Sequence, residues 1–296
     1  MTTVAPIEAL RSCPSGRYED GLVLVSAAAA EDGSARAGPG GITAQRWPGG
    51  RIAVRHRLGP RGLDDEIAGP LAAALAPLTD DHEIFARAFT GIVLTSRRDA
   101  GDAWEEFYRN TLARIPGPGD PGAGDAPEPP GYTAVYRHAM TLLPRTSVAD
   151  IGCGFGFLAL HLAARGTAVT ACEINPGTTR LLERMAGRLG RFLRIVTGDG
   201  GEPGRLAPGS VDAVALLHVL EHVGGDAASA LIGQATQIAR HRVVIAVPYE
   251  PQPARLFGHL RTINAGQLGQ LGAGSGWDYR VHEHHGGWLV LDRPAR

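Results

Sequence analysis

The stretch Ser147-Val-Ala-Asp-Ile-Gly-Cys-Gly-Phe-Gly-Phe157 predicts a buried strand that runs into a glycine-rich loop and then a helix. An apolar run with one acid, Asp150, is typical of a central parallel strand whose carboxyl end borders a ligand-binding site. Glycines that permit positive φ and close backbone approach to a ligand follow at alternate positions, namely Gly152, Gly154 and Gly156. The helix predicted over 157–165 would direct the positive end of its dipole at that ligand.

This glycine loop does not fit the dinucleotide-binding fingerprint, which requires a glycine where the chain has Phe157. The pattern Asp150-x-Gly152-x-Gly154-x-Gly156 instead resembles the first motif of class I S-adenosylmethionine-dependent methyltransferases. The resemblance implies that the acid and the glycines face the methionine end of S-adenosylmethionine. A glycine turn that serves only helix–strand packing is the alternative interpretation.

Composition excludes several classes of partner. The 296 residues carry a formal net charge of -1, so no bulk field attracts nucleic acid or an anionic membrane. Cys13, Cys153 and Cys172 are an odd number and are expected to be reduced. No apolar run reaches the ~18 residues of a membrane span, and the first residues do not resemble a signal peptide. A cytoplasmic location is therefore expected, whereas the oligomeric state is not predicted.

The first 115 residues predict a small α+β unit. Strands are expected over 21–26, over 51–56 as a half-exposed antiparallel strand, and over 90–95. Helices are expected over 63–78, over 82–89 after the caps Asp80 and Asp81, and over 103–112 after the cap Asp102. Residues 116–131 are rich in proline and glycine and predict a linker at a domain boundary.

Residues 132–296 alternate between helical and apolar-strand patterns, which predicts a Rossmann-like α/β fold with a doubly wound, mostly parallel sheet. After a first helix over 132–143, strands are expected over 148–151, 167–172, 192–196, 211–217 and 243–247, with helices over 157–165, 178–189 and 227–239. The segments 279–285 and 288–292 flank Gly286-Gly287, which predicts an antiparallel terminal hairpin. That ending resembles the methyltransferase sheet and not the NAD-type sheet.

The strand ends carry residues suited to S-adenosylmethionine, because ligands of open α/β sheets bind outside the carboxyl ends of the strands. By the same family resemblance, Glu173 would accept hydrogen bonds from the ribose hydroxyls, and Asp199 with Gly200 would face the adenine. Leu217 and His218 would lie beneath the cofactor. For Glu173 and Asp199 the alternatives are a solvated strand-end acid and ordinary turn chemistry.

Methyl transfer from a sulfonium is an in-line displacement, in which the enzyme positions the acceptor and helps to remove a hydroxyl proton. The catalytic candidates are His222, Glu221, His218 and His259. The His218-x-x-Glu221-His222 pattern also matches the inverted zinc-peptidase motif, but it straddles a strand end instead of lying on a helix. Ubiquinone-biosynthetic O-methyltransferases carry Glu-x-x-Glu-His, associated with a divalent metal. Only Glu221 and His222 match that motif, so a metal is possible but not favoured.

Two further sets of polar residues remain open to more than one interpretation. The hairpin sequence His282-Glu-His-His285 places His282 and His284 on one face, and either a metal site or an exposed hairpin is possible. Arg261, like His259, follows the fifth strand and is expected either to bind acceptor hydroxyls or to lie on the surface.

Strings spread along the chain resemble the mycofactocin-associated methyltransferases: Cys13-Pro-Ser-Gly-Arg-Tyr18, Trp104-Glu-Glu-Phe-Tyr108, Cys153-Gly-Phe-Gly-Phe157 and His282-Glu-His-His-Gly-Gly-Trp288. This resemblance implies O-methylation of a glucose hydroxyl in the oligosaccharide of that cofactor. The alternatives are metal-assisted methylation of another small metabolite and a non-catalytic nucleotide-type binding module. Nucleic acid is disfavoured as acceptor, since no base-flipping motif follows strand four.

Overall fold

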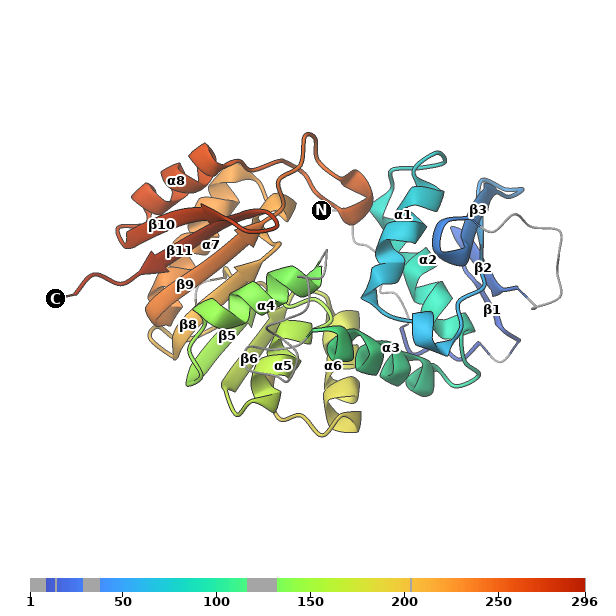
Figure 1. Ribbon diagram of the computed structural model, residues 1–296, viewed down its shortest axis with the longest axis horizontal. Helices are drawn as coiled ribbons and strands as arrows, with labels where there is room; N and C mark the ends of the chain where they lie inside the picture. The colour runs from blue at the N-terminus through green and yellow to red at the C-terminus, as the bar shows by residue number, and fades with distance from the viewer. Residues whose placement is uncertain (1–8, 14, 29–37, 116–131, 203, 296) are drawn as a thin grey trace, which may run out of the picture. The chain divides into compact units, whose positions relative to one another are not determined.

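The computed structural model describes residues 9–13, 15–28, 38–115, 132–202 and 204–295 (Figure 1). Its described residues fall into two compact units. The first comprises residues 1–113 together with 255–258, and the second comprises 114–254 together with 259–296. The segment 255–258 therefore joins the first unit, which the boundary drawn from the sequence does not anticipate. The linker expected over 116–131 lies outside the described residues.

The first unit is a four-stranded sheet covered by helices (Figure 1). Its strands, in the sheet order β1-β2-β4-β3, are β1 (Arg17–Glu19), β2 (Val23–Ala27), β4 (Ile52–His56) and β3 (Ile42–Arg46). Its helices are α1 (Ala68–Leu75), α2 (His82–Thr95) and α3 (Ala100–Arg114), with 3-10 turns at Pro39–Gly41, Pro60–Gly62, Asp65–Ile67 and Arg255–Phe257. Phe257 packs edge-on against Phe85 of α2, with ring centroids 5.1 Å apart, which ties the segment 255–258 to this unit.

Three expectations for this unit are wrong in detail. The strand expected over 90–95 is the second half of α2, which begins where the Asp81 side chain accepts a hydrogen bond from the Glu83 N–H. A short apolar run does not distinguish a buried strand from a buried helix. Helix α3 begins earlier than expected, because Asp99 and not Asp102 accepts from its first turn. Strand β4 is interior: it is parallel to β2 and antiparallel to β3.

The second unit is built on a seven-stranded sheet of order β10-β11-β9-β8-β5-β6-β7. The strands are β5 (Ser147–Ile151), β6 (Ala168–Glu173), β7 (Arg194–Thr197), β8 (Val211–Leu217), β9 (Ala239–Val247), β10 (Asp278–Glu283) and β11 (Gly287–Asp292). The helices are α4 (Tyr132–Leu142), α5 (Phe157–Ala164), α6 (Pro176–Arg188), α7 (Gly225–Ile238) and α8 (Ala265–Gly274), with a 3-10 turn at Leu220–His222. Strand β11 runs opposite to the other six strands, so its pairings with β9 and β10 are antiparallel.

Helices cover both faces of this sheet, as expected for a doubly wound fold (Figure 1). Residues Val243, Ile245 and Val247 of β9 join the buried cluster that α7 supplies with Leu231 and Ile232. The alternate residues of β9 are also buried, which is typical of a strand covered on both faces. The predicted fold class is therefore confirmed, including the antiparallel terminal hairpin.

One element of the second unit was missed. The sequence analysis predicted neither a helix nor a strand where α8 forms. The segment Ala265-Gly-Gln-Leu-Gly-Gln-Leu-Gly-Ala-Gly274 is rich in glycine, a poor helix former. A capping box stabilises its first turn, since the Asn264 side chain accepts from the Gln267 N–H and the Gln267 side chain accepts from the Asn264 N–H. Leu268 is fully buried and anchors the helix on the sheet.

No helix in the described part of the chain has the length and apolar character that a membrane crossing requires.

Candidate functional site

The glycine loop that follows β5 has the backbone geometry for close approach to a ligand. Gly152, Gly154 and Gly156 all have positive φ, between 52° and 79°. A Cβ on Gly152 would lie 2.6 Å from the Val219 side chain, whereas a Cβ on Gly154 would meet no atom within 4 Å. Gly152 is therefore required by packing, while the space beside Gly154 is open, as a loop that faces a ligand requires.

Glu173, at the end of β6, is held against this loop. Its Oε2 accepts a hydrogen bond from the Gly154 N–H at 3.1 Å, and its Oε1 accepts from the Asn175 N–H at 2.9 Å. Each carboxylate oxygen has a second lone pair, so these bonds leave acceptor capacity for a ribose hydroxyl. The structure thus brings the predicted ribose-binding acid next to the predicted methionine-facing loop.

Asp199 and Gly200 follow β7 at the same edge of the sheet. The Asp199 side chain accepts a hydrogen bond from the Gly201 N–H at 2.8 Å, which forms a tight turn. A Cβ on Gly200 would lie 2.4 Å from Cγ2 of Ile151, at the end of β5. Only glycine allows this turn to pack directly against the central strand.

Asp150 is a buried acid beneath the glycine loop. It is 3% exposed, and burial raises the pKa of its carboxyl to about 7; the Glu173 charge adds to that shift and a backbone contact with Ala159 opposes it. A cationic group such as the ammonium of an amino acid would favour the charged carboxylate. The environment of Asp150 is therefore suited to a cationic ligand.

Leu217 ends β8 and His218 begins the turn that follows it. His218 has φ 55°, in the left-handed region that is uncommon for residues other than glycine. Its N–H donates to the Ala246 carbonyl of β9 at 2.9 Å, and its ring lies 5.0 Å from the ring of Tyr132. The unusual backbone conformation turns the chain directly into Leu220–His222.

Three of the predicted catalytic side chains come together beside the Leu220–His222 turn. Glu221 and His222 lie on the 3-10 turn after β8, and His259 lies on the segment after β9. One potential ligand atom of each lies within 4.8 Å of those of the other two. The fourth candidate, His218, has its Nδ1 3.1 Å from Oε1 of Glu221, although the geometry is not that of a hydrogen bond.

Glu250 is a site residue that the sequence analysis missed. Its Oε2 lies 2.8 Å from Nδ1 of His259, which is 3% exposed. A backbone bond from the Leu260 N–H to the Glu221 carbonyl, at 2.8 Å, holds the His259 segment against the Leu220–His222 turn. The position of Glu250 shortly after an apolar strand was the available signal, because strand ends of parallel sheets gather at one edge.

The hairpin histidines form a separate cluster with α4. His282 and His284 both contact His138: the Nε2 atoms of His138 and His282 are 2.7 Å apart, and the His138 and His284 rings stack at 4.1 Å. Trp288 packs edge-on against His138 with ring centroids 4.6 Å apart. Burial, followed by the charges of Arg280 and His284, lowers the pKa of His282. These rings form an aromatic cluster, not an exposed hairpin.

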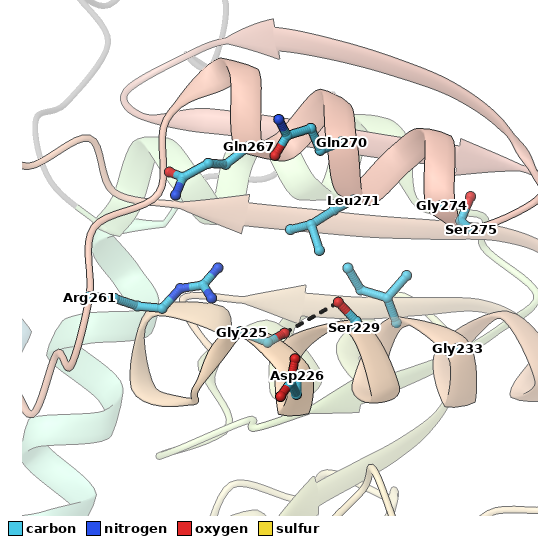
Figure 2. Close-up of a pocket in the computed structure, with 11 residues that line it drawn as sticks. Gly225, Asp226, Ser229, Gly233, Arg261, Gln267, Gln270, Leu271, Gly274 and Ser275 are labelled. Atoms are coloured by element: carbon cyan, nitrogen blue, oxygen red, sulfur yellow. Dashed lines mark hydrogen bonds between the residues drawn. The ribbon is translucent and has the colours of Figure 1, made fainter.

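A polar pocket of about 410 Å³ lies between α7 and α8 (Figure 2). Its lining is contributed by Gly225, Asp226, Ser229, Ile232, Gly233, Arg261, Gln267, Gln270, Leu271, Gly274 and Ser275. The Arg261 guanidinium points toward Gly225 at the start of α7, and two amide side chains lie on α8 (Figure 2). The pocket combines a cation, a carboxylate, two hydroxyls and two amides, which together can donate to and accept from several hydroxyl groups.

Comparison with known proteins covers part of the chain. Residues 149–246 match the profile of the methyltransferase domain family. A magnesium-protoporphyrin O-methyltransferase of Synechocystis sp. is 30% identical over 110 residues, which are 35% of this chain and 45% of that protein. A ubiquinone biosynthesis O-methyltransferase of Xanthomonas campestris pv. campestris is 32% identical over 90 residues, which are 30% of this chain and 37% of that protein. The chain thus spans less than half the length of these curated relatives.

Among solved structures, a magnesium protoporphyrin IX methyltransferase from Synechocystis with bound S-adenosylmethionine gives a TM-score of 0.43 at 20% identity. That similarity covers 54% of this chain and 76% of the other. The matched residues carry the glycine loop and the central strands of the doubly wound sheet, and they form a methyltransferase domain.

Proposed function

We propose that the chain is an S-adenosylmethionine-dependent O-methyltransferase whose acceptor is a hydroxyl of a small molecule or glycan, specifically a glucose unit of a mycofactocin-type oligosaccharide. The observation that carries the O-methyltransferase proposal is the grouping of Glu221, His222 and His259 at the sheet edge that also carries the glycine loop. Cofactor and proton-handling groups belong at one edge in an enzyme that methylates a hydroxyl. The similar curated proteins are also named O-methyltransferases.

The site residues have distinct proposed roles. Asp150 and the three glycines hold the methionine end of the cofactor, Glu173 holds the ribose, and Asp199 with Gly200 faces the adenine, while Leu217 and His218 lie beneath it. Glu221, His222 and His259 assist the loss of the proton of the acceptor hydroxyl as methyl transfer proceeds. His218 adjoins this group through its 3.1 Å approach to Glu221.

The pocket between α7 and α8 supports the glycan acceptor. Its volume of about 410 Å³ falls in the range of small-molecule sites, and its polar lining matches a ligand with many hydroxyl groups. Sequence strings that resemble the mycofactocin-associated family occur in both units, which supports the narrower choice of a glucose in that oligosaccharide.

The test begins with calorimetric titration of S-adenosylhomocysteine and, separately, of NADH. S-adenosylhomocysteine should bind with micromolar affinity, NADH should not, and Glu173→Ala should remove most of that affinity. Methyl transfer is then measured with labelled S-adenosylmethionine and a panel of glucosides. Failure to bind S-adenosylhomocysteine would shift the function to a non-catalytic binding module.

A pair of glutamine variants tests the acceptor pocket. Gln270 lines the pocket on α8, so Gln270→Leu should raise the KM for the glucoside about tenfold and leave kcat and cofactor affinity unchanged. Gln237→Leu is the matched control, because Gln237 is an exposed residue of α7 outside the pocket lining. An unchanged KM in Gln270→Leu would place the acceptor elsewhere.

A further inference from the structure

The grouping of Glu221, His222 and His259 is held by the backbone. Glu221 and His222 are adjacent on one 3-10 turn, and the Leu260 N–H bond to the Glu221 carbonyl places His259 beside them. The rings of His222 and His259 lie 4.9 Å apart and nearly perpendicular, at 86°. Of the residues that the structure describes, only these three form a group of His, Cys, Asp or Glu close enough to share one ion.

The Glu221 carboxylate is the second observation. The side chain is 1% exposed, and neither of its oxygens has a hydrogen-bond partner within the described part of the chain. A buried carboxylate without donors is costly unless a cation compensates its charge. The His218 ring approaches this carboxylate, but its Nδ1 also lacks a hydrogen-bond partner despite the 3.1 Å separation.

The contact between Glu250 and His259 is the third observation. An Nδ1–H that donates to a carboxylate fixes the imidazole tautomer whose Nε2 carries a lone pair. Histidines that ligate metals commonly have such a carboxylate partner. Glu250 therefore prepares His259 as a ligand, while the exposure of His222 leaves the grouping accessible.

We propose that Glu221, His222 and His259 bind one divalent metal ion, with Glu250 as the residue that orients His259. Two imidazoles and one carboxylate favour Zn²⁺, Mn²⁺, Fe²⁺ or Co²⁺ over Mg²⁺ or Ca²⁺, which prefer oxygen ligands. Three protein ligands leave positions for water or acceptor hydroxyls, whose pKa the ion would lower.

The ligand set differs from the one that the sequence suggests. The Glu-x-x-Glu-His motif would take its first ligand from position 218, which is His218 here, and the sequence alone therefore does not favour a metal. In the structure the third ligand comes from the segment after β9 instead. Metal binding by this grouping does not depend on methyl transfer, so it is testable apart from the proposed function.

The experiment is a Co²⁺ titration of the full-length, EDTA-treated protein, followed by visible absorption and by calorimetry with Zn²⁺. One site of micromolar affinity or tighter is expected. Glu221→Gln should weaken binding at least about 100-fold, and Glu250→Gln about 10- to 100-fold with the site still formed. His241→Ala is the matched control, since His241 is 73% exposed at the start of β9, at the opposite edge of the sheet, and should bind as wild type does.

Three results would overturn the assignment. The first is a wild-type protein without a Co²⁺ spectrum, and the second is a Glu221→Gln variant that binds as tightly as wild type. The third is binding that is lost in His282→Ala, which would place the ion at the His138–His282–His284 cluster. S-adenosylhomocysteine affinity is measured on every variant to verify folding. If the wild-type protein binds Co²⁺ but not S-adenosylhomocysteine, the proposed function is overturned and the metal site remains supported.

Discussion

Two carboxylates of low exposure, one in each unit, have opposite surroundings. Asp20 in the first unit accepts hydrogen bonds from the N–H groups of Leu22 and Val23, from the Tyr18 hydroxyl and from Arg87, all at 2.8 to 2.9 Å. Glu221 in the second unit is more deeply buried, and its oxygens have no hydrogen-bond partner in the described structure. The chain itself supplies hydrogen-bond donors to both oxygens of Asp20, but it supplies none to Glu221 within the described residues.

This difference is the basis for treating Asp20 as a structural acid and Glu221 as a proposed metal ligand. Burial alone would raise the pKa of Asp20, but the donors from Val23, Leu22, Arg87 and Tyr18 lower it, so the native fold stabilises its charge. Glu221 has no such donors within the described residues, and the proposed metal ion would compensate its charge. Substitutions at the two positions should therefore affect different properties.

The largest effect is expected for Asp20→Ala. The substitution leaves two backbone N–H groups, the Tyr18 hydroxyl and the Arg87 guanidinium without their acceptor, so it should lower the free energy of unfolding by about 3–5 kcal/mol. Urea denaturation of the full chain measures this change in the free energy of unfolding. Glu105→Ala is the control, because its ion pair with the 57% exposed Arg109 should contribute under about 1 kcal/mol. Equal effects in both variants would contradict the comparison.

The next largest effect is expected on the pH dependence of stability, and it comes from His56, a buried polar residue of the first unit. Thr95 donates its hydroxyl to the Gly91 carbonyl, so Nε2 of His56 must donate to Thr95, and burial lowers the pKa of His56 to about 4. The unfolded state, with a pKa near 6.5, binds more protons between these values. Stability should therefore be complete above pH 6.5 and fall by about 3 kcal/mol as the pH drops to 4.

This pH dependence is measured by denaturation at several pH values in wild type and His56→Gln, which retains a donor for Thr95. The slope between pH 4 and 6.5 should be smaller in the variant. An identical slope would show that other groups cause the acid sensitivity.

The smallest effect on stability, and the most informative one, is expected for Glu221→Gln. Removing an uncompensated buried charge should not lower the free energy of unfolding of the metal-free protein. Methyl transfer, in contrast, should fall at least about 100-fold. A loss of several kcal/mol would indicate that a charged His218 pairs with Glu221 and that the carboxylate is structural, as Asp20 is.

Local sequence patterns predicted the second unit better than the first. Its parallel strands are long apolar runs that end at polar residues such as Glu173, and its hairpin is marked by Gly286-Gly287. In the first unit, the run 90–95 is buried within α2, and its apolar character did not reveal whether it would be helical or extended. Glycine-rich α8 was missed because its stability comes from the Asn264 cap and from burial of Leu268.

The sequence by itself determined the order of the elements around the glycine loop and the acids at the strand ends, since these depend on residue type and spacing along the chain. It also identified the candidates His218, Glu221, His222 and His259. Only the tertiary structure decided which of them meet, and it added Glu250. The physical reason is that the path of the segment after β9 depends on a long-range hydrogen bond, from the Leu260 N–H to the Glu221 carbonyl, that no local pattern encodes.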